Sequence, residues 1–313
     1  MARILWTFRV ALASIAAMTS SSLLAGQCGF RRAFDRPDEG GTATVQVFKG
    51  DPVAALGNER PLLFITSLKV NTDGTKISYH KDDLRCAANP AATPCAINNI
   101  RNAYNDADRP ESDFAAVRDA SFPLPKTWRV LSETIIEKNA STGKPCITSD
   151  GYLVSMTADR AINDGREGDC EQSKWIDALS VPAIVLPKGS QFVDARLGKR
   201  SLVVAASGST TKRVVPGIVG DFGPRNELGE ATIAMNRALN GLPDTEQPKH
   251  RADAINRFQA KRTAVLLFPG SGSVLARPIT SARVAEAGKD ALSKFGGADK
   301  LYGCIRDEID RAF

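Results

Sequence analysis

Histidine is scarce in this sequence, and closely spaced cysteine pairs are missing. It has only two histidines, His80 and His250, and its six cysteines include no Cys-x-x-Cys pair. Structural zinc sites use cysteine and histidine at close, characteristic spacings. A zinc centre is therefore disfavoured, and we expect neither a metal ion nor an organic cofactor.

Nucleotide and nucleic-acid binding signals are missing as well. There is no G-x-G-x-x-G or Gly-Lys-Ser/Thr loop of the kind that cradles phosphates. Aromatic residues make up only 6% of the chain, and its basic residues are scattered without aromatics between them. The net charge of +6 therefore predicts a solvated basic exterior and no nucleic-acid partner.

The longest apolar run lies near the amino terminus, at Val10–Met18. It follows two arginines and precedes small residues, which is the pattern of a secretory signal. A transmembrane anchor is the alternative, but the run is well short of the roughly 20 residues that cross a bilayer. We expect residues 1–26 to be a signal peptide, cleaved near Ala25 or Gly26, and the mature protein to be secreted or periplasmic without a membrane span.

The six cysteines of an exported chain predict disulfides, although six cysteines allow 15 pairings. Proximity in the sequence favours Cys86 with Cys95 and Cys146 with Cys170. Cys28 then remains to join the amino terminus to Cys304.

Periodicity predicts one β-rich α+β domain, with a small barrel-like β core and helices packed outside. Residues 27–58 are glycine-rich and charged, so we expect a loosely structured arm before a single domain at 59–313. Strands are expected at 62–70, 76–80, 128–136, 152–157, 183–186, 202–206, 214–219 and 264–268, the first two as a hairpin across Asp73-Gly74. Helices are expected at 230–239, 252–261, 281–295 and 298–312.

Two carboxylates flank a glycine- and proline-rich turn in the second half of the chain. An apolar strand beginning at Val214 ends at Asp221, and Gly229-Glu230 opens the expected helix. Hydrolysis of a glycosidic bond needs two carboxyl groups, one to protonate the leaving oxygen and one to activate water or attack. Asp221 and Glu230 suit that chemistry, although acidic helix starts are also common structural devices.

Several ordered segments resemble glycoside hydrolase family 75, the fungal-type chitosanases and their bacterial relatives. They are Asn102-Ala103-Tyr104, Gly151–Thr157, Trp175–Pro187, Gly220–Pro224, Gly229–Ala234 and Leu267–Gly272. The resemblance implies an endo-acting, inverting hydrolase of β-1,4-linked glucosamine polymer with Asp221 and Glu230 as its catalytic pair. Where the family carries an Asp-x-Asp-Gly run, this sequence has Cys95-Ala96-Ile97-Asn98-Asn99-Ile100, which removes negative charge from the expected cleft wall.

Three further residues are candidates for binding the substrate, namely Asp177, Tyr152 and Tyr104. Asp177 has an alternative role as a cap before the next strand. Because chitosan is a polycation, we expect acids from Asp159–Asp177 and Asp106–Asp113 to surround the catalytic pair. The alternatives are hydrolysis of another amino-sugar polymer, such as chitin or peptidoglycan glycan, and a catalytically silent polysaccharide-binding envelope protein. We expect a monomer.

Overall fold

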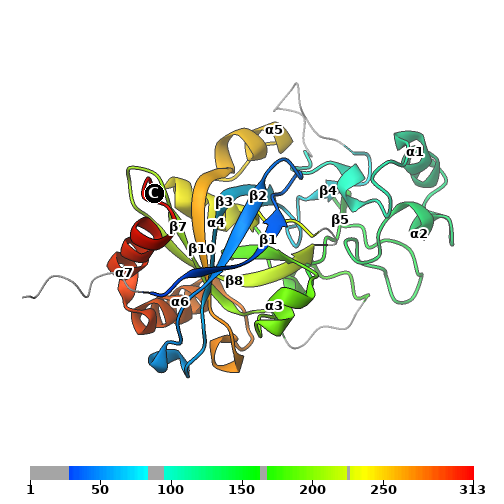
Figure 1. Cartoon of the computed structure of the whole chain (residues 1–313). Coiled ribbons are helices and arrows are strands. Elements are labelled where there is room, and N and C mark those ends of the chain that lie inside the picture. Colours follow the sequence, from blue (N-terminus) through cyan, green and yellow to red (C-terminus); the bar gives the residue numbers. More distant parts are fainter. Residues whose placement is uncertain (1–27, 84–94, 163–167, 224–225) are drawn as a thin grey trace, which may run out of the picture.

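The computed structural model of the chain describes residues 28–83, 95–162, 168–223 and 226–313 (Figure 1). The expected signal peptide lies outside these residues. The strands are β1 (Arg31–Pro37), β2 (Thr44–Lys49), β3 (Leu62–Asn71), β4 (Tyr79–His80), β5 (Tyr152–Leu153), β6 (Ala183–Pro187), β7 (Leu202–Ser207), β8 (Val214–Gly223), β9 (Glu230–Thr232) and β10 (Ala260–Leu267). The α-helices are α1 (Glu111–Asp119), α2 (Thr127–Val130), α3 (Ser190–Asp194), α4 (Ile233–Asn240), α5 (Arg251–Asp253), α6 (Ser281–Phe295) and α7 (Gly297–Cys304).

Six of the strands close into a barrel in the order β3-β10-β7-β8-β6-β9, and β9 pairs with β3 to complete the ring. Both faces of these strands are covered. Along β7, Val203 and Ala205 belong to one apolar cluster, and Val204 and Ala206 belong to another. A strand buried on both faces reads as a continuous apolar run, which is how this segment appears in the sequence. The expected β-rich α+β fold with a barrel-like core is confirmed.

The expectation of a loose arm at residues 27–58 is wrong. β1 and β2 form an antiparallel pair, and β2 extends the sheet beyond β3. In β2, Val45 and Val47 are buried while Thr44 and Gln46 are exposed, as in a strand with one covered face. This alternation is brief and follows a glycine-rich turn, so the local pattern did not reveal it.

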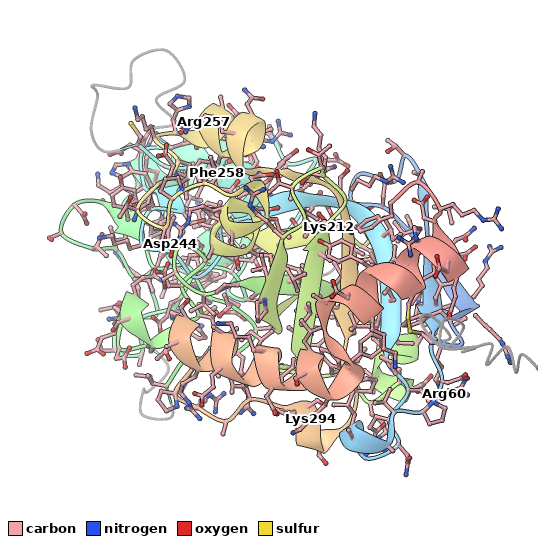
Figure 2. All side chains as sticks on the ribbon, turned by 90° about the vertical axis from the view of Figure 1, so that its left-hand side faces the viewer. Arg60, Lys212, Asp244, Arg257, Phe258 and Lys294 are labelled. Atoms are coloured by element: carbon pink, nitrogen blue, oxygen red, sulfur yellow. A yellow bond between two sulfur atoms is a disulfide. The ribbon has the colours of Figure 1, made fainter. Side chains whose placement is uncertain are left out.

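Helices cover the barrel strands on different sides. α4 contacts all six of them, and its Met235 and Leu239 join the apolar cluster that contains Val203. α6 packs on β7 and β8, and Figure 2 shows α6 and α7 lying across the outside of these strands. α6 has the expected bounds, whereas the helix expected at 252–261 ends by Phe258, because β10 begins at Ala260.

Two other local expectations are wrong. β4 does not return along β3 as a hairpin but pairs with β5 in a separate two-stranded sheet. The intervening turn is closed on itself, with the Thr72 and Ser78 hydroxyls 2.6 Å apart, and it leads the chain away from the barrel. Residues 128–136 are not a strand either, because they begin inside α2.

The described residues between β3 and β6 form a layer beside the barrel, here called the lateral layer, with α1, α2, β4 and β5 at the right of Figure 1. It has an apolar cluster of its own, which includes Tyr79, Phe114 and Leu131. None of the helices in the described ranges is long and apolar enough to cross a membrane.

Two of the expected disulfides are present. Cys146 and Cys170 tie the lateral layer together, with their Cα atoms 5.1 Å apart. Cys28 and Cys304 join the start of the described chain to α7, with Cα atoms 5.8 Å apart. Cys95 is also disulfide-bonded, whereas its expected partner Cys86 lies outside the described residues.

Candidate active site

A cleft of about 1690 Å³ lies between the barrel and the lateral layer. The barrel contributes residues of β6, β8 and β9, among them Val185, Asp221 and Glu230. The lateral layer contributes polar and aromatic side chains, including Tyr79 and Tyr104. Both expected catalytic carboxylates and one expected substrate-binding tyrosine therefore line the same cleft.

Asp221 owes its direction to an irregularity in β8. The pairing of β6 with β8 advances from Ile184–Val219 to Val185–Asp221, so Gly220 is an extra residue on β8. A bulge of this kind re-aims the side chain that follows it. Gly220 also allows close approach, because a Cβ on it would lie 2.7 Å from the Cβ of Ala183. Asp221 thereby shares a face with Val185, which lines the cleft.

The Asp221 carboxylate is held by the backbone. Its Oδ1 accepts hydrogen bonds from the backbone N–H of Ala158 at 2.8 Å and of Phe222 at 2.7 Å. Burial raises the pKa of Asp221, and these two bonds and the charges of Lys188 and Lys199 oppose the rise. One oxygen is therefore fixed while the group keeps a tendency to take up a proton.

Glu230 lies in strand β9, not in a helix as expected from the sequence, because α4 begins only at Ile233. It pairs with Val185 of β6 on one side and with Lys69 of β3 on the other. Thr232 fixes this junction: its Oγ1 donates to the carbonyl of Val181 and accepts from the N–H of Ala183, both at 2.9 Å. The strand pairing thus decides where Glu230 points.

A third carboxylate, Asp73, lines the cleft and was not anticipated from the sequence. It lies two residues beyond the end of β3, and its Oδ1 accepts hydrogen bonds from the Tyr79 hydroxyl at 2.7 Å and the Ser155 hydroxyl at 3.3 Å. Burial, with the charge of Asp221, raises the pKa of Asp73 to about 7. Asp73-Gly74 predicts a turn, and the signal that could have marked Asp73 as a site residue is its position just beyond a buried strand.

Asn98, from the segment that departs from the family pattern, belongs to the same network. Its amide donates to the Thr72 hydroxyl at 2.8 Å and to the Tyr79 hydroxyl at 3.1 Å. The hydroxyl of Tyr79 therefore donates to Asp73 and accepts from Asn98. A neutral amide at this place orients the tyrosine without adding charge to the cleft wall.

Two of the expected substrate-binding residues do not reach the cleft. Asp177 caps a turn, accepting from the N–H of Leu179 at 3.1 Å and from the Ser180 hydroxyl at 2.8 Å. Tyr152 lies in β5 and donates to the carbonyl of Cys95 at 3.2 Å. The capping alternative for Asp177 is the one that the structure bears out.

The expected acidic walls are also wrong. Among their described members only Asp159 lines the cleft, and it is paired with Arg200 at 2.8 Å and with Arg277. Asp164 and Glu167 lie outside the described residues. The charged lining is mixed, with acids Glu39, Asp73, Glu133, Glu137, Asp159, Asp221, Glu227 and Glu230 and bases Arg101, Lys138, Arg160, Lys188, Lys199 and Arg277.

One group of potential metal ligands stands out in the described part of the chain, formed by Cys28, Cys304 and Glu308. Its two sulfurs are joined in a disulfide, and the Glu308 carboxylate accepts from the N–H groups of Cys28 and Phe30 at 2.5 and 2.7 Å. The disulfide and these hydrogen bonds join the start of the described chain to its carboxyl-terminal helices. Because the sulfurs are bonded to each other, these residues do not fit a metal ion.

No protein-family model matches the sequence, and no curated protein is significantly similar to it.

Proposed function

We propose that this chain is an endo-acting glycoside hydrolase that cleaves β-1,4-linked glucosamine polymer with Asp221 and Glu230. The observation that carries the proposal is the pairing of both residues with Val185, one from each neighbouring strand. Directly paired residues point to the same face of a sheet. The two carboxylates thus flank Val185 on the face that lines the cleft.

The strand spacing leaves room for a water molecule between the Asp221 and Glu230 carboxylates, which inversion of configuration requires. Asp221 and Glu230 lie two strands apart, which puts their Cα atoms about 10 Å from each other at roughly 4.8 Å per strand. Inverting enzymes hold their carboxyl groups about 6.5–9.5 Å apart to leave room for a water, whereas retaining enzymes need about 5–5.5 Å. Side chains that lean slightly toward each other from these positions still leave space for that water.

The size of the cleft favours a polymer. A volume of about 1690 Å³ exceeds the range of roughly 300–1,000 Å³ that is usual for sites of small molecules. Its lining has eight carboxylates and six basic side chains, so it is locally more acidic than the chain as a whole. The choice of glucosamine polymer comes from the resemblance to family 75.

A second candidate substrate is an amino-sugar polymer that carries carboxylates, such as peptidoglycan glycan. Two of the six cationic side chains that line the cleft, Lys188 and Lys199, act on the charge of Asp221. Positive charge near the reacting bond favours an anionic neighbour and disfavours a polycation.

We also propose that the protein acts outside the cytoplasm. The two disulfides that were placed correctly from the sequence support this location, because such bonds persist in oxidising compartments. Sequencing the amino terminus of the exported protein tests it: a start near Ala25 is expected, and an intact Met1 would contradict it.

The decisive experiment is a reducing-end assay on chitosan, chitin and peptidoglycan. Wild type should cleave one of them. The activity of D221N and of E230Q should each be at least about 100-fold lower, which is the smaller end of the usual contribution of acid–base catalysis. D244N is the control, since the Asp244 side chain is 97% exposed. Binding of all three polymers without cleavage would leave a polysaccharide-binding protein instead.

A further inference from the structure

One segment of the lateral layer holds two carboxylates of the cleft at once. In residues 155–158, the Ser155 hydroxyl donates to Asp73 and the Ala158 N–H donates to Asp221. Gln172 locks this arrangement, because its amide donates to the carbonyls of Gly74 at 2.8 Å and of Ser155 at 2.7 Å. These hydrogen bonds fix the position of Asp73 relative to Asp221.

The turn itself leaves little freedom. Gly74 has φ +86°, and a Cβ on it would lie 2.0 Å from the carbonyl oxygen of Ile176. The backbone after Asp73 therefore packs directly against Ile176, in the segment that precedes β6. Such close packing preorganises a side chain for a chemical step.

The two neighbouring carboxyls receive different donors. Asp73 is bonded by two neutral hydroxyls, those of Tyr79 and Ser155. Asp221 is bonded by two backbone N–H groups and feels the charges of two lysines. Of two carboxyls close enough to repel each other, the one with weaker support for its anion keeps the proton. That carboxyl is Asp73.

We propose that Asp73 donates the proton to the leaving glycosidic oxygen, an assignment that rests on the proposed hydrolase function. In this step the Asp73 proton passes to the glycosidic oxygen as the bond from that oxygen to the anomeric carbon breaks. A water oxygen bonds to the anomeric carbon, and the proton that the water loses passes to the carboxylate of Asp221 or of Glu230. The second carboxylate of the pair faces the positive charge that develops at the anomeric carbon.

The test uses two substrates with different leaving groups. Asn is isosteric with Asp and retains the acceptor for Tyr79, so D73N should keep the fold. Its activity on the natural polymer should fall by at least about 100-fold. Its activity on a nitrophenyl glycoside of a glucosamine oligomer should stay within about tenfold of wild type, because that leaving group departs without a proton. D221N and E230Q should lose activity on both substrates, and D244N on neither. Loss of both activities in D73N, or of neither, overturns the assignment.

Y79F gives a readout that a purely structural role would not move. The Tyr79 hydroxyl stabilises the anion of Asp73 and so lowers its pKa, and its removal should raise that pKa and move the basic limb of the pH–rate profile to higher pH. A basic limb that stays in place would overturn the assignment.

Carboxyl ¹³C NMR separates this inference from the proposed function. If wild type cleaves neither substrate, the hydrolase proposal fails, yet the Asp73 carboxyl can still be titrated. It should titrate near 7 in wild type and lower in D221N, because the charge of Asp221 raises its pKa. Titration of Asp73 near 4 in wild type would overturn its role as the carboxyl that holds the proton.

Discussion

D73N should make the protein more stable at pH 8 than the wild type. The pKa of Asp73 is raised from 3.8 to about 7 in the folded protein, so between these values the native state binds more protons than the unfolded state. The free energy of unfolding therefore falls as the pH rises through this window and is level above about 7. Below about pH 4 both states are protonated and the penalty is absent.

The size of the penalty follows from the width of that window. A rise from 3.8 to about 7 corresponds to at most about 4 kcal/mol, at 1.36 kcal/mol for each pH unit. Asp73 lines the cleft and is only half-buried, so water reduces the penalty below this limit. D73N removes the ionisable group while keeping its shape.

Urea unfolding at pH 4, 6 and 8 measures the difference directly. D73N should gain up to about 4 kcal/mol over wild type at pH 8 and almost nothing at pH 4. D244N, at a side chain that is 97% exposed, should follow the wild type at every pH. A difference between D73N and wild type that does not change with pH would refute the reasoning.

Three further substitutions test a buried ion pair, the turn after Asp73 and a disulfide. K174A should lower the free energy of unfolding by about 3–5 kcal/mol, because it leaves the buried Glu137 carboxylate without its cation; urea unfolding at pH 7 checks this, and a loss below 1 kcal/mol would contradict it. G74A should abolish polymer hydrolysis, since its Cβ would collide with the carbonyl oxygen of Ile176, and an active variant would show that the turn can shift. C304A opens a disulfide that spans 276 residues and should lower stability by roughly 2–5 kcal/mol, measured by thermal unfolding against wild type with and without reductant.

Local patterns predicted the inner strands well. β6, β7, β8 and β10 were predicted within a few residues of their ends, because each contains a short apolar run with glycine, proline or charged residues near its ends. β1 and β2 were missed because a strand with only one covered face has a weaker pattern. The hairpin after β3 failed because the turn signal is local, whereas the partner of β4 lies more than 70 residues away in the sequence.

The sequence by itself predicted the inner strands, two of the disulfide pairs and Asp221 and Glu230 as candidate catalytic carboxylates. Only the tertiary structure decided where these carboxylates point. A bulge at Gly220 turns Asp221, and pairing with Val185 turns Glu230, and neither feature has a local signature. Asp73 became part of the site in the same way, because its hydrogen-bond partner Ser155 comes from a segment 82 residues away and the charge that raises its pKa comes from another strand. Burial and neighbouring charges, which set the protonation of a carboxyl group, exist only once the chain is folded.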